Sequence, residues 1–232
     1  MSQEPLPAPS TPENPPPASN RRLTGGCLMM LVVAGWIVAL GVWMAWHLYG
    51  QVREIRTFTD PTAQAISPLA PTGAQKSELQ GRLAAFATAI GAKQAASLTL
   101  SVDDLNHLLA AQEPVNRLQD IARVEAITDV IRVKVALALN GIPFTGERLY
   151  LNGFISVRPD LKKDLGPVLL TRAIEVPGRP LTEGFTKTYL EANHLDSLAL
   201  DEVRKDEGLK PLLGKITSLR CEPGQVIAEY VP

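Results

Sequence analysis

The sequence has few cysteines and almost no net charge, and each shortage argues against a class of protein. Two cysteines in 232 residues argue against a disulfide-rich scaffold. A net charge of −1 argues against a general nucleic-acid binder, which needs a basic surface to displace counterions. The hydrophobic content of 45% is nevertheless too high for a wholly disordered chain. We therefore expect at least one folded domain and no nucleic-acid partner.

Motifs for common catalytic sites are also missing. The chain has no H-E-x-x-H, no G-x-S-x-G, no Walker loop and no glycine-rich dinucleotide fingerprint. Cys27 and Cys221 lie too far apart in the predicted organisation to form a disulfide, and no Cys/His cluster has zinc spacing. Asp103 and His107 would share one helix face, but no third ligand accompanies them. We therefore predict no catalytic residue, no cofactor and no metal, and we expect Cys221 to be inert.

The first segment is a proline-rich tail over residues 1–22. Seven of the 19 prolines fall in the first twenty residues, where the only charges are Glu4 and Glu13. Such a composition cannot bury enough apolar surface to offset the entropy lost on ordering. We predict a disordered tail with polyproline II character.

A transmembrane helix is predicted from Leu23 to Tyr49. No charged side chain occurs between Leu23 and Trp46, and all three tryptophans lie in this segment. These 24 residues would span about 36 Å as a helix, which exceeds the roughly 30 Å of a bilayer's hydrocarbon core. Trp43, Trp46 and Tyr49 resemble an interfacial aromatic belt.

The segment has the features of an uncleaved signal anchor. It is longer than the apolar region of a signal peptide, and no small-residue cleavage site directly follows it. Arg21 and Arg22 precede the span, whereas Arg53 and Arg56 follow it at a greater distance. Because positive residues nearest the membrane favour the cytoplasmic side, we predict a cytoplasmic N-terminus. The C-terminal domain would then lie on the periplasmic or extracellular side.

The rest of the chain divides into a linker and a domain. Residues 50–74 are predicted to form a juxtamembrane segment and a flexible linker, because prolines and Gly73 accompany a single charge, Asp60, over 57–74. Residues 75–232 are long enough for one domain with its own core. Hydrophobic spacing predicts helices near 75–90, after Ser101 and over 181–213, with the other elements being strands. The predicted strands are a short one with Leu98 and Leu100 on one face, followed by strands over 121–126, 131–139, 149–157, 167–176, 215–221 and 225–231.

Short turns between these strands imply an antiparallel sheet. We therefore expect an α+β fold in which an N-terminal transmembrane helix precedes one exported domain. Helices would cover a face of the sheet.

One short motif provides a resemblance to a known family. Leu98-Thr-Leu-Ser-Val-Asp-Asp-Leu-Asn-His-Leu-Leu109 is similar to the L-x-L-[ST]-x-x-[DE]-L-N-x-L-L pattern of YpmS-like envelope proteins. Ser101 and Asp104 are placed as a capping box, while Leu105 and Leu109 fall on the apolar stripe. Asn106 is required by neither capping nor packing, and we expect its side chain to bind nearby backbone groups.

This resemblance covers residues 95–160 and does not extend to the helical region 181–213. It implies a single-span envelope protein with a tail, a span, a strand-helix motif and long antiparallel strands. It also implies a possible lipid-binding fold.

Three functions remain open at this point. The first is a non-enzymatic, membrane-anchored module that binds or assembles an envelope protein partner or a lipid. The second is a lipid-binding domain with an apolar groove between its alternating strands and helices. The third is an unrecognised hydrolase, because a Ser/His/Asp set can assemble in three dimensions without a local motif. The sequence leaves the oligomeric state open.

Overall fold

A computed structural model describes residues 25–67, 69, 71–111, 118–139, 147–162, 166–192, 194–205 and 210–232. The predicted tail over residues 1–22 lies outside these ranges. The chain separates into two compact units, residues 1–49 and 50–232.

Helix α1 (Gly25–Phe58) begins in the first unit and ends in the second. Among the described residues, the large hydrophobic side chains that are exposed lie between Met29 and Tyr49, apart from Val231. Trp46, for example, is 80% exposed. In the described part of the chain, α1 is the one helix that is long and apolar enough to cross a membrane by length and composition.

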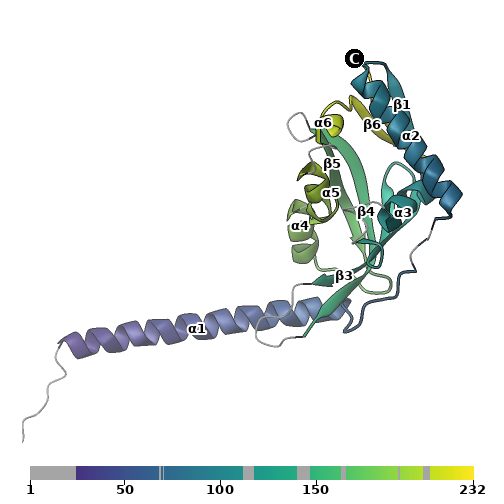
Figure 1. The fold of residues 1–232 in the computed structure, drawn as a ribbon. Helices are drawn as coiled ribbons and strands as arrows, with labels where there is room; N and C mark the ends of the chain where they lie inside the picture. The colour runs from purple at the N-terminus through teal and green to yellow at the C-terminus, as the bar shows by residue number, and fades with distance from the viewer. Residues whose placement is uncertain are drawn as a thin grey trace, which may run out of the picture. The chain divides into compact units, whose positions relative to one another are not determined.

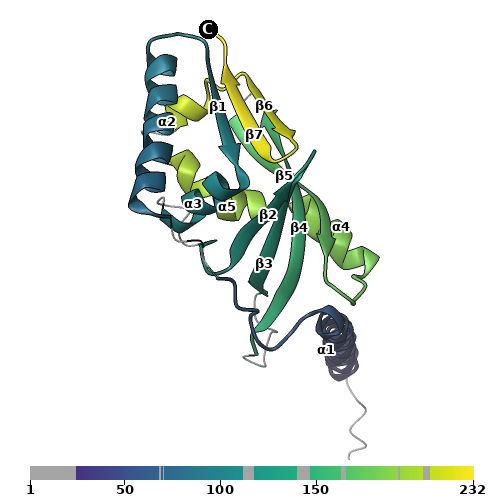
Figure 2. The same ribbon diagram turned by 90° about the vertical axis from the view of Figure 1, so that its right-hand side faces the viewer.

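The second unit contains two antiparallel sheets and the helices around them (Figure 1 and Figure 2). In chain order its further elements are α2 (Gly73–Gly91), β1 (Ala96–Ser101), α3 (Val102–Ala111), β2 (Ala122–Ile127), β3 (Ile131–Leu139), β4 (Leu149–Lys162), β5 (Gly166–Glu175), α4 (Glu183–Ala192), α5 (His194–Lys205), α6 (Lys210–Leu213), β6 (Ser218–Glu222) and β7 (Gln225–Tyr230). The predicted α+β class with antiparallel pairing is therefore confirmed.

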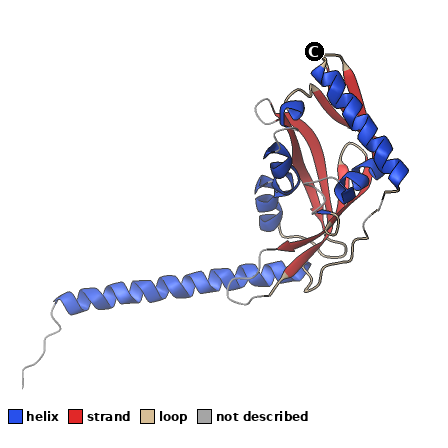
Figure 3. Ribbon diagram, viewed as in Figure 1, coloured by secondary structure: helices blue, strands red, loops and turns tan. Residues whose placement is uncertain are grey.

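The strands form two sheets rather than the single sheet that we expected. One sheet has the order β2-β3-β4-β5, and the other has the order β1-β7-β6. Figure 3 shows the strands in red and the helices in blue. Strand β1 pairs with the last strand of the chain, with Leu98 opposite Ala228. This long-range pairing has no local signal, because the two strands are separated by all the other strands.

Strand β4 shows how the larger sheet obtains a dry face and a wet face. Its odd-numbered residues from Leu149 to Pro159 are buried, whereas its even-numbered residues are half-buried or exposed. On the dry side, Leu151 and Ile155 are fully buried in the core. Gly153 lies where β5 approaches, since a Cβ there would stand 2.3 Å from the carbonyl oxygen of Glu175. Helices α4 and α5 pack beside β5.

The last turn of α1 belongs to the domain core. Phe58 is completely buried, and its ring centroid lies 4.5 Å from that of Phe185 in α4. Phe185 in turn lies 5.6 Å from Tyr189, which is also buried. Ile55 packs against the same cluster. The domain therefore begins before the boundary at residue 75 that we predicted.

The segment expected to be a flexible linker is partly helical and packed instead. Residues 50–58 belong to α1, and the following chain pairs with β4 through backbone hydrogen bonds between Asp60 and Tyr150. The side-chain nitrogen of Asn152 donates to Asp60 and to the Thr62 carbonyl, and Asn152 accepts from the Gln64 amide. These hydrogen bonds hold the segment against β4, because they satisfy backbone groups that would otherwise bond to water.

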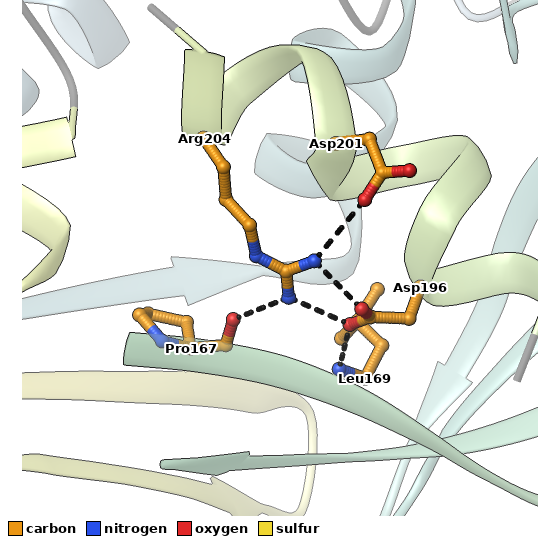
Figure 4. Close-up of polar contacts among 5 residues, drawn as sticks. All are labelled: Pro167, Leu169, Asp196, Asp201 and Arg204. Carbon is orange, nitrogen blue, oxygen red and sulfur yellow. Dashed lines mark hydrogen bonds and ion pairs between the residues drawn. The ribbon is translucent and has the colours of Figure 1, made fainter. Parts of the chain in front are cut away.

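Two side chains of α5 form hydrogen bonds with backbone groups on the outer edge of strand β5 (Figure 4). The Leu169 amide donates to Asp196 at 2.6 Å, and Arg204 donates to the Pro167 carbonyl at 2.9 Å. Arg204 also holds both carboxylate oxygens of Asp196 and contacts Asp201. The cluster fastens α5 to β5 and closes this edge against pairing with another strand.

Candidate functional site

The predicted motif forms a closed polar network at the start of α3. The Ser101 hydroxyl accepts from the Asp104 amide at 3.1 Å, and the Asp104 carboxylate accepts from the Ser101 amide at 2.9 Å. This is a reciprocal capping box, in which two backbone donors at a helix start are satisfied. Leu105 and Leu109 pack against the core from the next turns.

Arg82 joins this network to α2 and to strand β1. Its guanidinium pairs with Asp104 and donates to the Thr99 carbonyl at 3.0 Å. Burial alone would raise the pKa of Asp104, but the Arg82 guanidinium and the Ser101 donors outweigh burial and hold that pKa below the usual range of an aspartate. The Asp104 carboxylate is therefore ionised at neutral pH and helps to hold α2, β1 and α3 together.

We expect Asp104→Asn to lower stability by about 1 kcal/mol at neutral pH, a usual cost for a weakened helix cap. A carboxyl whose pKa is depressed by folding contributes stability above its unfolded pKa, and the contribution disappears as pH falls through its folded pKa. The stability difference between wild type and variant should thus be complete above about pH 5 and shrink as the pH falls through the lowered pKa of Asp104. Urea unfolding at several pH values measures it, and a difference that grows in acid would contradict this role.

Asn106 binds the backbone of strand β2 and is itself buried. Its side-chain nitrogen donates to the Val124 carbonyl at 2.9 Å, and its side-chain oxygen accepts from the Val124 amide at 2.8 Å. The amide thus takes the place of a neighbouring strand at this sheet edge. The expected backbone contact exists, but it reaches 18 residues along the chain rather than to nearby groups.

Asn106→Ala should destabilise the domain by about 2–4 kcal/mol, because it leaves two buried backbone groups without partners. Asn106→Asp should also destabilise it, since a carboxylate cannot donate to the Val124 carbonyl. Chemical unfolding compares these variants with the wild type. Asp103→Ala, an exposed change on the same helix, is the matched control and should alter stability by less than about 0.5 kcal/mol.

His107 lies against a polar pocket between α2 and α3. The pocket measures about 360 Å³ and is lined by Gln75, Glu78, Arg82, Ser101, Asp103, Asp104 and His107. In the described ranges, His107 makes no hydrogen bond to Ser101, Asp103 or Asp104, and the Ser101 hydroxyl is used in the capping box. The pocket therefore contains a serine, a histidine and aspartates, as a hydrolase site would, but Ser101 and His107 are not hydrogen-bonded to each other as a nucleophile and its base would be.

The other residues considered from the sequence do not join this pocket. His194 begins α5, and its side chain lies outside the described part. Cys221 is a free, half-buried thiol in β6, and burial raises its pKa, which disfavours the reactive thiolate. Among the described residues, no group of three His, Cys, Asp or Glu side chains could hold a metal ion.

The apolar strand faces that suggested a lipid groove are packed into the core. Val135, Leu151 and Ile155 have no exposed surface, and their neighbours include Phe58 and Ile174. The strands therefore use these side chains to stabilise the fold.

A second pocket lies at the wet face of the larger sheet, next to β2. It measures about 400 Å³ and is lined by Ala65, Ile66, Ser67, Val102, Asp103, Asn106, Arg123, Val124, Glu125 and Lys134. Arg123 and Lys134 were not among the site residues predicted from the sequence. The available signal was the alternation of basic residues with apolar ones in the predicted strand over 131–139, but only strand register shows which bases become neighbours.

Comparisons with known proteins found no matching family model, no matching curated protein and no matching solved structure. They give no test of the resemblance carried by residues 98–109.

Proposed function

We propose that this chain is a membrane-anchored envelope protein whose folded domain is a non-enzymatic binding or assembly module beside the bilayer. The observation that carries the proposal is helix α1. Its described residues from Met29 to Tyr49 expose large apolar side chains, yet its last residue, Phe58, is completely buried in the domain. Exposed apolar surface of this kind is costly in water and suits a bilayer.

The length of chain between the apolar stretch and the domain supports a position close to the membrane. Ile55, which packs against the core, lies six positions after Tyr49. Even a fully extended chain of that length spans only about 20 Å. The domain can therefore work on partners at the membrane surface, and we place it on the non-cytoplasmic side according to the arginines that precede the span.

Membrane anchoring is tested with the full chain in isolated membranes. Ile37→Asp combined with Leu40→Asp should release the protein into the alkaline carbonate wash, since each acid costs about 2.5–3.5 kcal/mol at the centre of a membrane helix. Val231→Asp is the matched control, because it replaces an exposed apolar residue of the domain, and it should stay in the pellet. Release of the wild-type chain by the same wash would refute the anchor.

Orientation and the absence of catalysis need separate measurements. In sealed vesicles with the cytoplasmic side outward, the domain should resist added protease until detergent opens the vesicles. Cleavage of the domain without detergent would reverse the proposed orientation.

Turnover of ester, phosphoester, peptide or glycoside substrates that is lost in His107→Ala would replace the binding module with the hydrolase alternative.

A further inference from the structure

A row of polar and aromatic side chains crosses the wet face of the larger sheet. Arg123 of β2 lies opposite Lys134 of β3, Lys134 lies opposite Phe154 of β4, and Phe154 lies opposite Glu175 of β5. Arg132 stands two residues before Lys134 and so points to the same face. The row therefore brings three cations and one carboxylate onto four neighbouring strands.

The single carboxylate of the row is used by one of these cations. Arg132 pairs with Glu175 at 2.8 Å, and its guanidinium lies 4.4 Å from the centre of the Phe154 ring. Both contacts hold Arg132 at the β4–β5 end of the row. Glu175 is therefore already paired with Arg132 and does not neutralise the cations at the β2–β3 end of the row.

Arg123 and Lys134 are left as adjacent like charges. Within the part of the chain that the structure describes, neither has a carboxylate at ion-pair distance. Both side chains are half-buried, and like charges directly opposite each other on two strands are destabilising. Natural proteins keep such unfavourable arrangements where function requires them.

These two cations line the 400 Å³ pocket described above. Its volume falls in the range of small-molecule sites, and the Ser67 residue from the segment after α1 completes one side. Asp103 and Glu125 also line it and are exposed at their positions, so they set a limit on how much negative charge can enter. The lining therefore carries two cations and two carboxylates, and its half-buried cation pair is the part that suits one compact anionic group.

We propose that Arg123 and Lys134 form a binding site for a phosphate group. Arginine offers a planar set of donors that matches phosphate, and lysine adds a compact point charge. The inference rests on the proposed function, because it names the ligand that a membrane-proximal binding module would take. The phosphate can belong to an anionic lipid headgroup or to a soluble phosphate ester.

The full chain in phosphatidylcholine nanodiscs is titrated with inorganic phosphate and with glycerol phosphate, and calorimetry records binding. A parallel sample in nanodiscs containing phosphatidylglycerol is analysed by hydrogen exchange over residues 122–135. Saturable binding of a soluble probe identifies a soluble phosphate source. Protection that appears only with phosphatidylglycerol identifies a lipid headgroup.

Arg123→Gln combined with Lys134→Gln should weaken either response at least tenfold. Arg172→Gln combined with Lys187→Gln removes the same charge from exposed positions outside the pocket and should leave the response unchanged. If both double variants lose binding equally, the interaction is general charge attraction and the site is refuted. The absence of any response to all three probes also refutes it, while membrane extraction still tests the anchor separately.

Lys134→Glu separates binding from folding. It gives Arg123 an opposite charge as its cross-strand neighbour, so the melting temperature should rise while phosphate binding is lost. A variant that is more stable yet binds as well as the wild type would contradict the proposal.

Discussion

Replacing Phe58 with alanine is expected to destabilise the domain by about 3–5 kcal/mol, the usual cost of removing a buried aromatic ring. Phe58 is completely buried, and it contacts Phe185, which continues to Tyr189. The variant leaves a cavity between the last turn of α1 and helix α4. Urea unfolding of the full chain in detergent micelles, followed by circular dichroism, measures the loss.

Two further variants make this result specific. Phe58→Leu fills most of the same space and should cost less than about 1.5 kcal/mol. Phe86→Ala, a half-buried phenylalanine of α2, should cost clearly less than Phe58→Ala. Equal losses for Phe58→Ala and Phe86→Ala would show that the end of α1 does not contribute to the core as the structure indicates.

The same packing predicts where a shortened chain can begin. A chain of residues 50–232 keeps Phe58 and the segment bound to Asn152, so it should unfold cooperatively. A chain of residues 75–232 lacks both and should be unstable or aggregate, because it exposes the apolar surface that Phe58 covers. Equal stability of the two chains would contradict this boundary.

The second large loss of folding stability is expected for substitutions of Arg204. Arg204→Ala leaves the Asp196 carboxylate, whose side chain is only 13% exposed, without its cation and frees the Pro167 carbonyl. Removing one partner of a buried pair costs about 3–5 kcal/mol, and the remaining solvent contact should reduce this to about 2–4 kcal/mol. Arg204→Lys should recover little, since an ammonium cannot hold both carboxylate oxygens in the same geometry.

Arg220→Ala is the matched control for this experiment. Arg220 also pairs with two carboxylates, those of Glu222 and Glu229, but its side chain is 44% exposed. Exposed pairs contribute little to stability because water and salt screen them, so this variant should unfold close to the wild type. A loss as large as that of Arg204→Ala would mean that pairing itself, rather than closure of the β5 edge, decides stability.

Local signals predicted the elements well. The alternation over 131–139 predicts the strand β3 (Ile131–Leu139), and the final hairpin is found as β6 and β7. Ser101 was expected to start a helix, and α3 begins at Val102. These features depend on spacing within one segment, which a single sequence contains.

Contacts between distant segments could not be predicted in the same way. Asn106 binds Val124, and Asp196 binds Leu169, across 18 and 27 residues. The residue types indicate hydrogen-bonding ability but not the partner, because pairing depends on how helices are placed at a sheet edge. The candidate phosphate site has the same origin, since Arg123 and Lys134 become neighbours only through the register of β2 and β3.

Hydrophobic spacing acts over neighbouring residues, so one chain's residue pattern was enough to predict the apolar helix, the α+β class and most element boundaries. The proline-containing segment after Phe58 joins the domain through hydrogen bonds to Asn152 and Tyr150 of β4, and these contacts exist only in the folded chain. Folding also sets which charged side chains of the larger sheet become neighbours. Glu175 is paired with Arg132, and Arg123 is left beside Lys134. Charge balance in a sequence is an average, whereas the electrostatics of a site depend on which side chains folding places within a few ångströms.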